Sequence, residues 1–327
     1  MRYRTFGDTG VSISEIGLGT WQLGAEWGDV SDSQAQAILD TARDAGISFF
    51  DTADVYGLGR SEERIRTFLS RCSKPVFVAT KLGRFPEPGW PENFTFESFR
   101  THVEASLTRL GVEALDLTQM HCIPTEVLRD GAVFDHLRRL KTDGKIKAFG
   151  VSVETVEEGL ICLEQEGVTS LQVIFNMFRQ KPARELFDLA KAKGVAIIAR
   201  VPMASGLLSG KFTVDQTFDK DDHRTFNRDG AAFNVGETFA GLPFEKGVRL
   251  ADRLKDMVPE GLSLADMALR WILDHDAVST VIPGATRPEQ ALSNARASDL
   301  PPLGADLHAQ LAAFYDSDIA EHIRGAY

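Results

Sequence analysis

Short apolar runs alternate along this chain with segments whose apolar residues recur every three or four positions. Helix-like segments such as VFDHLRRLKTDGK (residues 133–145) separate the runs, and their spacing predicts amphipathic helices. Because the runs are almost wholly apolar, we expect parallel strands buried on both faces. Eight such strand–helix units predict an α/β fold, the (β/α)8 or TIM barrel. The expected strands are residues 16–20, 47–51, 76–81, 115–121, 146–152, 171–175, 195–199 and 278–282.

Two regions depart from this alternation. The residues before position 16 form two short alternating segments around a turn at Thr9-Gly10, which predicts an N-terminal β-hairpin. Residues 212–239 mix charges with five phenylalanines. This long loop at the carboxyl-end face is expected to be a mobile cover over a ligand, with a rigid surface excursion as the alternative. Because no Pro/Ser-rich linker divides the chain, residues 1–327 are expected to form a single domain.

Composition points to a small-molecule partner. The 327 residues carry a formal net charge of -11, whereas a nucleic-acid or anionic-membrane surface would need an excess of Lys and Arg. No run approaches the ~20 apolar residues that span a bilayer, and no signal peptide stands out, so we expect a cytoplasmic protein. Three cysteines without C-x-x-C spacing indicate neither a disulfide framework nor a zinc site, and no metal is expected.

Four polar residues stand at or just beyond the ends of consecutive predicted strands, where a barrel collects its catalytic groups. They are Asp51 and Tyr56 in FFDTADVYG, Lys81 ending PVFVATK, and His121 ending ALDLTQMH. Each alone has a plain structural explanation, as a helix cap, a core tyrosine, a solvated lysine or a semi-buried histidine. Their conjunction at the same ends of strands two, three and four favours a catalytic set.

These side chains suit reversible proton transfer to a carbonyl oxygen. A phenol with a pKa of about 10 donates a proton poorly near neutrality unless its anion is stabilised. The Lys81 ammonium would stabilise that anion, and Asp51 would keep Lys81 charged and oriented. His121 would hydrogen-bond the carbonyl oxygen and steer the substrate.

Two other enzyme classes fit the sequence less well. A dinucleotide fingerprint begins at Gly17 and Gly19, but the next glycine is Gly24 and no helix begins there, which disfavours a Rossmann fold. A metal-dependent hydrolase or isomerase would need clustered His and Asp/Glu at the strand ends, which the sequence lacks.

An ordered set of motifs extends over essentially the whole chain. The motifs are GLGTW (17–21), FFDTADVYG (49–57) followed by SEE, ATK (79–81), the strand ending in His121, GVS (150–152), QVIFN (172–176), GLLSGK (206–211) and IPGATRPEQ (282–290). In these the chain resembles the aldo-keto reductase superfamily. The resemblance implies a barrel that binds NADPH, and reversible hydride transfer between nicotinamide and an aldehyde or ketone. It also implies Tyr56 as general acid/base, Lys81 and Asp51 as its tuners, and His121 as the group that orients the carbonyl.

The resemblance further assigns binding residues by position. The implied cofactor-binding residues are Gly19, Thr20, Trp21, Asp51, Ser152, Gln172, Arg200, Pro202, Gly206, Leu207, Ser209, Lys211, Gly284, Thr286, Arg287, Gln290 and Asn294. The expected substrate contacts are Trp21, Tyr56, Trp90 and His121, with Trp27 also on a loop at the mouth, whereas Trp271 is expected in the core.

Three positions depart from the family pattern. Val153 stands where the family often has Asn beside the carboxamide. Arg200 replaces an aromatic residue that stacks under the nicotinamide; it could stack there, contact phosphate or pair with a carboxylate. Gly284 and Gln290 replace usual cations of the 2′-phosphate site, which leaves Arg287. We expect NADP (NADPH) to be preferred, with NAD possible.

The predicted function is therefore an NADP-dependent reductase of aldehydes, ketones or sugars. The alternative is a regulatory subunit that binds the cofactor with little turnover, as some relatives of the family do. Retention of all four strand-end residues favours the enzyme.

Overall fold

The computed structural model describes residues 1–24 and 30–327. The chain begins with the predicted hairpin, in which β1 (Tyr3–Thr5) pairs antiparallel with β2 (Ser12–Ser14). Phe6 and Ile13 of this hairpin are fully buried against Phe49 and Phe77 of the barrel strands. The hairpin therefore closes the N-terminal end of the barrel with apolar side chains.

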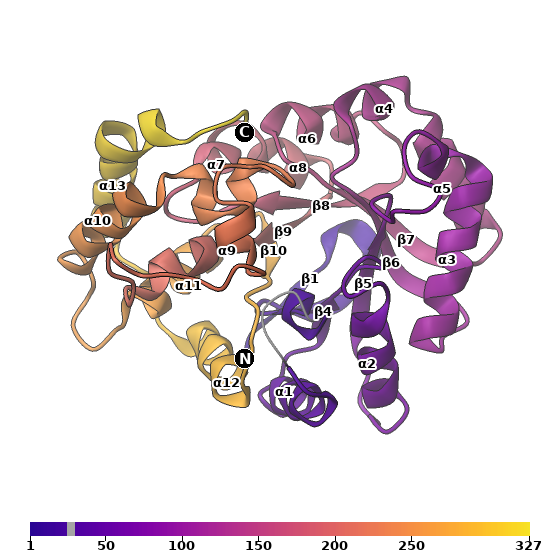
Figure 1. The fold of residues 1–327 in the computed structure, drawn as a ribbon, viewed down its shortest axis with the longest axis horizontal. Coiled ribbons are helices and arrows are strands. Elements are labelled where there is room, and N and C mark those ends of the chain that lie inside the picture. The colour runs from indigo at the N-terminus through magenta and orange to yellow at the C-terminus, as the bar shows by residue number, and fades with distance from the viewer. Residues whose placement is uncertain (25–29) are drawn as a thin grey trace.

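Eight parallel strands form one sheet in the order β10-β9-β8-β7-β6-β5-β4-β3 (Figure 1). Bridges between Ile16 and Val281 and between Gly19 and Gly284 join the first strand to the last, so that the sheet curls back on itself. The predicted (β/α)8 fold is thus confirmed. The strands are β3 (Leu18–Gly19), β4 (Phe49–Asp51), β5 (Phe77–Leu82), β6 (Leu115–His121), β7 (Ile146–Ser152), β8 (Val168–Ile174), β9 (Ala196–Arg200) and β10 (Val278–Val281).

Helices follow the strands and cover the outside of the sheet (Figure 1). Those before β9 are α1 (Asp32–Asp44), α2 (Arg60–Leu69), α3 (Phe96–Leu110), α4 (Thr125–Asp130), α5 (Ala132–Thr142), α6 (Val156–Leu163), α7 (Lys181–Glu185) and α8 (Phe187–Ala192). Those after it are α9 (His223–Phe226), α10 (Phe244–Lys255), α11 (Leu264–Leu273), α12 (Pro288–Arg296) and α13 (Ala305–Phe314). None of the described helices is long and apolar enough to cross a membrane.

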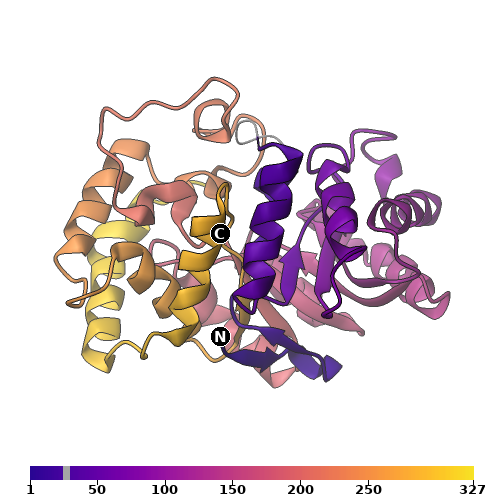
Figure 2. The same ribbon diagram turned by 90° about the horizontal axis from the view of Figure 1, so that it is seen from below.

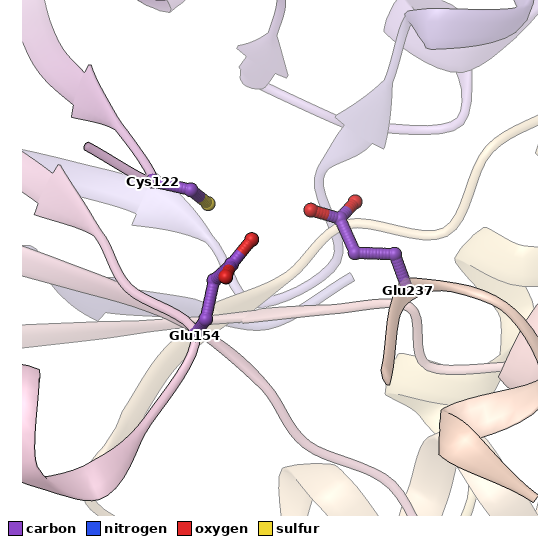
Figure 3. A group of neighbouring side chains, drawn as sticks. All are labelled: Cys122, Glu154 and Glu237. Atoms are coloured by element: carbon purple, nitrogen blue, oxygen red, sulfur yellow. The ribbon is translucent and has the colours of Figure 1, made fainter. Parts of the chain in front are cut away.

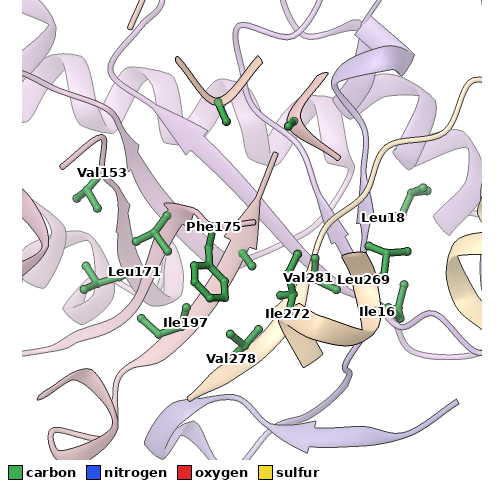
Figure 4. Packing of buried hydrophobic residues seen from close by; sticks show 14 of the residues in the cluster. Ile16, Leu18, Val153, Leu171, Phe175, Ile197, Leu269, Ile272, Val278 and Val281 are labelled. Atoms are coloured by element: carbon green, nitrogen blue, oxygen red, sulfur yellow. The ribbon is translucent and has the colours of Figure 1, made fainter. Parts of the chain in front are cut away.

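The main apolar core lies between these helices and the sheet. Leu18 and Val281 project into it from strands, Phe175 from the position just after β8, and Ile272 from α11 (Figure 4). Trp271 is 2% exposed and stacks on the Phe175 ring at 4.8 Å between centroids, which confirms its expected place in the core. Burial of such residues on both faces of the strands is what their unbroken apolar runs indicated.

Residues 212–239 lie at the end of the barrel opposite the hairpin (Figure 2). Asn227 organises this loop, since its side chain accepts from the backbone of Ala232 and Phe233 and donates to Thr238. Arg324, near the C-terminus, donates to the carbonyl of Arg228 at 2.9 Å. The loop is therefore folded and anchored over the carboxyl ends of the strands.

Candidate active site

The barrel brings the four strand-end residues into one cluster. Asp51 ends β4, Lys81 lies near the end of β5 and His121 ends β6. These strands are parallel neighbours, so their carboxyl ends meet at one end of the barrel. The Lys81 ammonium donates to Asp51 Oδ1 at 2.5 Å and to Tyr56 Oη at 3.2 Å. The rings of Tyr56 and His121 meet edge to face, 5.7 Å between centroids. The grouping expected from the sequence is the one observed.

Two glycines allow the chain to place Tyr56. A Cβ on Gly57 would lie 2.0 Å from the Gly24 carbonyl oxygen, and a Cβ on Gly24 would lie 2.7 Å from the Tyr56 backbone. Gly57 also has a φ of 60°, which side chains disfavour. This close crossing of two loops places Trp21 on Tyr56, with their rings stacked 6.1 Å apart. Trp21 thus lies directly against Tyr56.

The protonation states follow from burial and the ion pair. Burial raises the pKa of Tyr56, and the Lys81 ammonium opposes this only in part. Burial alone would lower the pKa of Lys81, but the Asp51 carboxylate and Tyr56 outweigh it, so the net shift is upward. Lys81 is therefore held charged, as expected. The Lys81 ammonium lowers the pKa of the Tyr56 phenol, in the expected direction, but burial raises that pKa by more.

His121 is held as a neutral imidazole. Burial lowers its pKa well below the usual value, and the positive charges of Arg84, Lys81 and Arg200 lower it further. Among the described residues its Nδ1 has no hydrogen-bond partner. A neutral imidazole carries one N–H donor and one nitrogen that accepts a hydrogen bond.

Two glutamines complete the surroundings of Asp51. Gln172 Nε2 donates to Asp51 Oδ2 at 2.7 Å, and Gln119 Nε2 donates to the same oxygen at 3.2 Å. Gln172 was expected only as a cofactor contact, and Gln119 was not identified from the sequence. Its signal was its place on β6, two residues before His121 and therefore on the same face of the strand.

Three of the predicted cofactor residues line the cluster itself. Ser152 pairs in register with His121, and its hydroxyl lies 3.4 Å from the Cys122 sulfur. Gly19 lies at the end of β3, while the Thr20 hydroxyl already donates to the Asp51 carbonyl at 2.8 Å. Val153 is buried and offers no side-chain polar group where an Asn was expected.

Apart from Arg200, which ends β9, the remaining predicted cofactor residues lie in two loops and in α12. After β9, Gly206 has a φ of 101° and the Ser209 hydroxyl donates to its carbonyl, so Ser209 acts as a turn residue. Before α12, Gln290 Oε1 accepts from the backbone N–H of Thr286 and Arg287. The first loop contains Pro202, Gly206, Leu207, Ser209 and Lys211, the second contains Gly284, Thr286 and Arg287, and α12 contains Gln290 and Asn294; Arg287 and Lys211 are exposed.

The other tryptophans are less informative. Trp90 is 56% exposed, and its recorded ring contact is with Phe94 of its own loop. The structure therefore does not bring Trp90 into the cluster around Tyr56. Trp27 lies outside the described residues.

A sequence model of the Aldo/keto reductase family matches residues 15–316. The chain belongs to the aldo/keto reductase family. It is similar to the aldo-keto reductase YhdN of Bacillus subtilis (strain 168), 29% identical over 300 residues that cover 89% of this chain and 86% of that protein. It is also 27% identical to the NADH-specific methylglyoxal reductase of Escherichia coli (strain K12), over 92% of this chain and 94% of that protein.

The fold agrees with that of solved relatives. The glycerol dehydrogenase AKR11B4 from Gluconobacter oxydans matches with a TM-score of 0.77 and 28% identity, covering 99% of this chain and 97% of that one. The resemblance stated from the motifs is confirmed. This aldo/keto reductase is an oxidoreductase, and its family uses nicotinamide cofactors and small carbonyl substrates.

The structure adds a charged group that the sequence did not reveal in this aldo/keto reductase. Cys122, Glu154 and Glu237 point toward one another from three different segments (Figure 3), with their sulfur and carboxylate atoms within 4.8 Å. Arg84 and Arg200 pair with the two carboxylates, at 2.9 Å to Glu154 and 3.1 Å to Glu237. Of the alternatives for Arg200, pairing with a carboxylate is the one observed. The signal in the sequence was that Arg84 and Glu154 closely follow strand ends.

Proposed function

We propose that this aldo/keto reductase reduces aldehydes or ketones with a nicotinamide cofactor, acting as one barrel domain with Tyr56 as the general acid/base. The observation that supports this most directly is the bridging ammonium of Lys81, which bonds both Asp51 and Tyr56. In reduction, a bound nicotinamide supplies hydride to the carbonyl carbon. Tyr56 gives its proton to the carbonyl oxygen, and the positive charge of Lys81 stabilises the phenolate that remains.

The other two residues support this proton transfer. Asp51 holds Lys81 charged through a buried contact, with Lys81 and Asp51 1% and 4% exposed. His121, neutral and beside Tyr56, offers an N–H to the same carbonyl oxygen and fixes its direction. In the oxidation direction the same groups would accept the proton from an alcohol.

The donor groups on the barrel rim fit an anionic dinucleotide. Arg287 is exposed at the N-terminus of α12, where the helix dipole also favours negative charge. Lys211 is exposed after the turn that follows β9. We propose that these two cations hold the phosphates, and that Gln172 Oε1, with Ser152, holds the carboxamide. Because Arg287 can pair with a 2′-phosphate, we propose a preference for NADPH over NADH.

A direct assay tests the function. Purified protein is mixed with NADPH or NADH and a panel of small aldehydes, ketones and sugars, and the nicotinamide absorbance is followed. The expected result is carbonyl-dependent oxidation of the cofactor, faster with NADPH. Tight cofactor binding with no turnover on the whole panel would instead favour a regulatory subunit.

A further inference from the structure

Four charged residues beside the catalytic cluster are linked by three ion pairs in the order Glu154, Arg84, Glu237 and Arg200, and we call them the paired-charge row. Arg84, in the loop after β5, pairs with Glu154 at 2.9 Å and Glu237 at 3.5 Å. Glu237 in turn pairs with Arg200, at the end of β9, at 3.1 Å. Two cations and two carboxylates therefore alternate, and their charges sum to zero.

The paired-charge row lies next to the residues of the catalytic cluster. Cys122 directly follows His121 in the chain, and its sulfur lies 3.4 Å from Arg200 Nη2 and near both carboxylates (Figure 3). The positive charges of Arg84 and Arg200 reach His121, and the negative charge of Glu237 reaches Tyr56. A substrate bound at Tyr56 and His121 would therefore meet the field of three of the four residues, Arg84, Arg200 and Glu237.

The paired-charge row also makes it unfavourable to place an additional charge beside it. The side chains of Arg200 and Glu237 are each 9% exposed, so their charges are screened poorly by water. Glu154 Oε1 accepts from Arg84, and its Oε2 accepts from Asn234 at 3.0 Å. Because the Glu154 and Glu237 carboxylates are already paired with arginines, the group of Cys122, Glu154 and Glu237 is poorly suited to hold a cation.

We propose that the paired-charge row makes the enzyme prefer uncharged carbonyl substrates to carbonyl substrates that carry a carboxylate. We further propose that Glu237 is the residue that sets this preference. The inference rests on the proposed function. An anionic substrate would have to displace Glu237 from Arg200 or leave one excess negative charge in a buried site, and both are unfavourable. An uncharged substrate leaves the pairs intact and can hydrogen-bond to their free donors and acceptors.

A matched pair of aldehydes isolates the charge. 4-Oxobutanoate and its methyl ester carry the same aldehyde and differ in the carboxylate. For the wild-type enzyme we expect kcat/KM to be at least tenfold higher for the ester. In Glu237→Gln, Arg200 loses its negative partner, so the ester-to-acid ratio should fall at least tenfold.

Two further variants define the comparison. Glu154→Gln should lower the same ratio through Arg84, and it provides a second test if Glu237→Gln does not fold. Glu157→Gln is the matched control, because Glu157 is exposed on α6 and pairs with Arg129 at the surface. The control should keep the wild-type ratio. Thermal denaturation and cofactor affinity show that each variant is folded.

The outcomes are distinct. If wild-type enzyme turns over the two aldehydes equally, or prefers the acid, the inference is wrong while the proposed function stands. An unchanged ester-to-acid ratio in both Glu237→Gln and Glu154→Gln, each shown to be folded, would also overturn the inference. Turnover of neither aldehyde with NADPH or NADH, nor of any other carbonyl in the panel, would overturn the proposed function and this inference with it.

Discussion

Gln172 donates its side-chain amide to Asp51 Oδ2 at 2.7 Å, while Lys81 occupies the other carboxylate oxygen at 2.5 Å. Gln119 of β6 also donates to Asp51 Oδ2. One carboxylate oxygen of Asp51 therefore faces a cation, and the other accepts from two neutral amides on β8 and β6. A buried carboxylate satisfied in this way has one preferred orientation. The position of Lys81, and through it of Tyr56, therefore depends on residues deep in the barrel.

Replacing Gln119 by leucine tests this dependence. Gln119→Leu removes one donor to the buried Asp51 carboxylate, and a hydrogen bond to a charged group contributes about 1.5–3 kcal/mol. We expect a loss of that order in the free energy of unfolding, measured by urea denaturation, and a fall of roughly tenfold in kcat. Thr118→Val is the control, because the Thr118 hydroxyl is buried without a partner among the described residues. Equal effects of the two changes would contradict the role of Gln119.

Removing the phenol of Tyr56 tests the acid. Tyr56→Phe should lower kcat by at least ~10²–10⁴, the usual contribution of a positioned acid. The dissociation constant of the cofactor should stay within a few-fold, because the phenol acts on the substrate oxygen. Lys81→Met should behave similarly. Steady-state kinetics and fluorescence titration measure the two effects, and near wild-type turnover by Tyr56→Phe would exclude the assignment.

Asp54 makes folding stability depend on pH. Burial, and then the nearby Glu62 carboxylate, raise the pKa of Asp54 to about 7 from 3.8, and neither oxygen has a hydrogen-bond partner among the described residues. The folded state therefore holds a proton that the unfolded state has released, so this group lowers stability as pH rises from about 4 to 7. Asp54→Asn removes that effect.

The stabilisation by Asp54→Asn should grow by about 2–3 kcal/mol between pH 5 and pH 8, since each pKa unit corresponds to about 1.36 kcal/mol. Urea denaturation of both proteins at the two pH values measures it. Asp116→Asn serves as the control, because Asp116 is partly exposed and already paired with Lys147. A stabilisation that is the same at pH 5 and pH 8 would show that Asp54 is ionised in the folded protein throughout.

The sequence predicted the helices and strands better than the long-range contacts between them. β6 and β7 begin and end where their apolar runs do, because a strand buried on both faces leaves few other patterns. The sequence Ser31-x-x-Gln34 has the capping-box pattern. Ser31 caps α1, whereas the Gln34 side chain donates to the Thr286 carbonyl. Local pattern could not reveal that second contact, because its partner lies 252 residues away.

The same limit applies to the site. The four strand-end residues were identified because each lies at or just beyond the end of a predicted strand. The pairing of Arg84 with Glu237 joins residues 153 positions apart, and it depends on how residues 212–239 fold over the barrel. The direction of the Tyr56 pKa also required the structure, because it depends on how completely the ring is buried.

Residues 212–239 are expected to become more protected when cofactor binds. Glu237 of this loop pairs with Arg84 and Arg200 beside the catalytic cluster, and Trp21 contacts Phe233 and His223. A ligand held between the loop and the strand ends should therefore restrain both. Hydrogen exchange with and without NADPH should show slower exchange in residues 212–239, while the β1–β2 hairpin at the other end stays unchanged. Equal exchange in both states would identify a static excursion.

Arg287 is expected to carry the preference for NADPH. NADPH differs from NADH by a 2′-phosphate, and Arg287 places an exposed guanidinium at the N-terminus of α12 in a protein of net charge -11. A charge-assisted hydrogen bond contributes about 1.5–3 kcal/mol, or roughly 10- to 150-fold in affinity. Arg287→Ala should weaken NADPH binding by that factor and leave NADH binding nearly unchanged. Arg296→Ala, at the other end of the same helix, is the control and should change neither.

Fluorescence quenching gives both dissociation constants. If the two cofactors weaken equally, Arg287 contacts a part that they share, and if the wild type already favours NADH, another residue sets the choice.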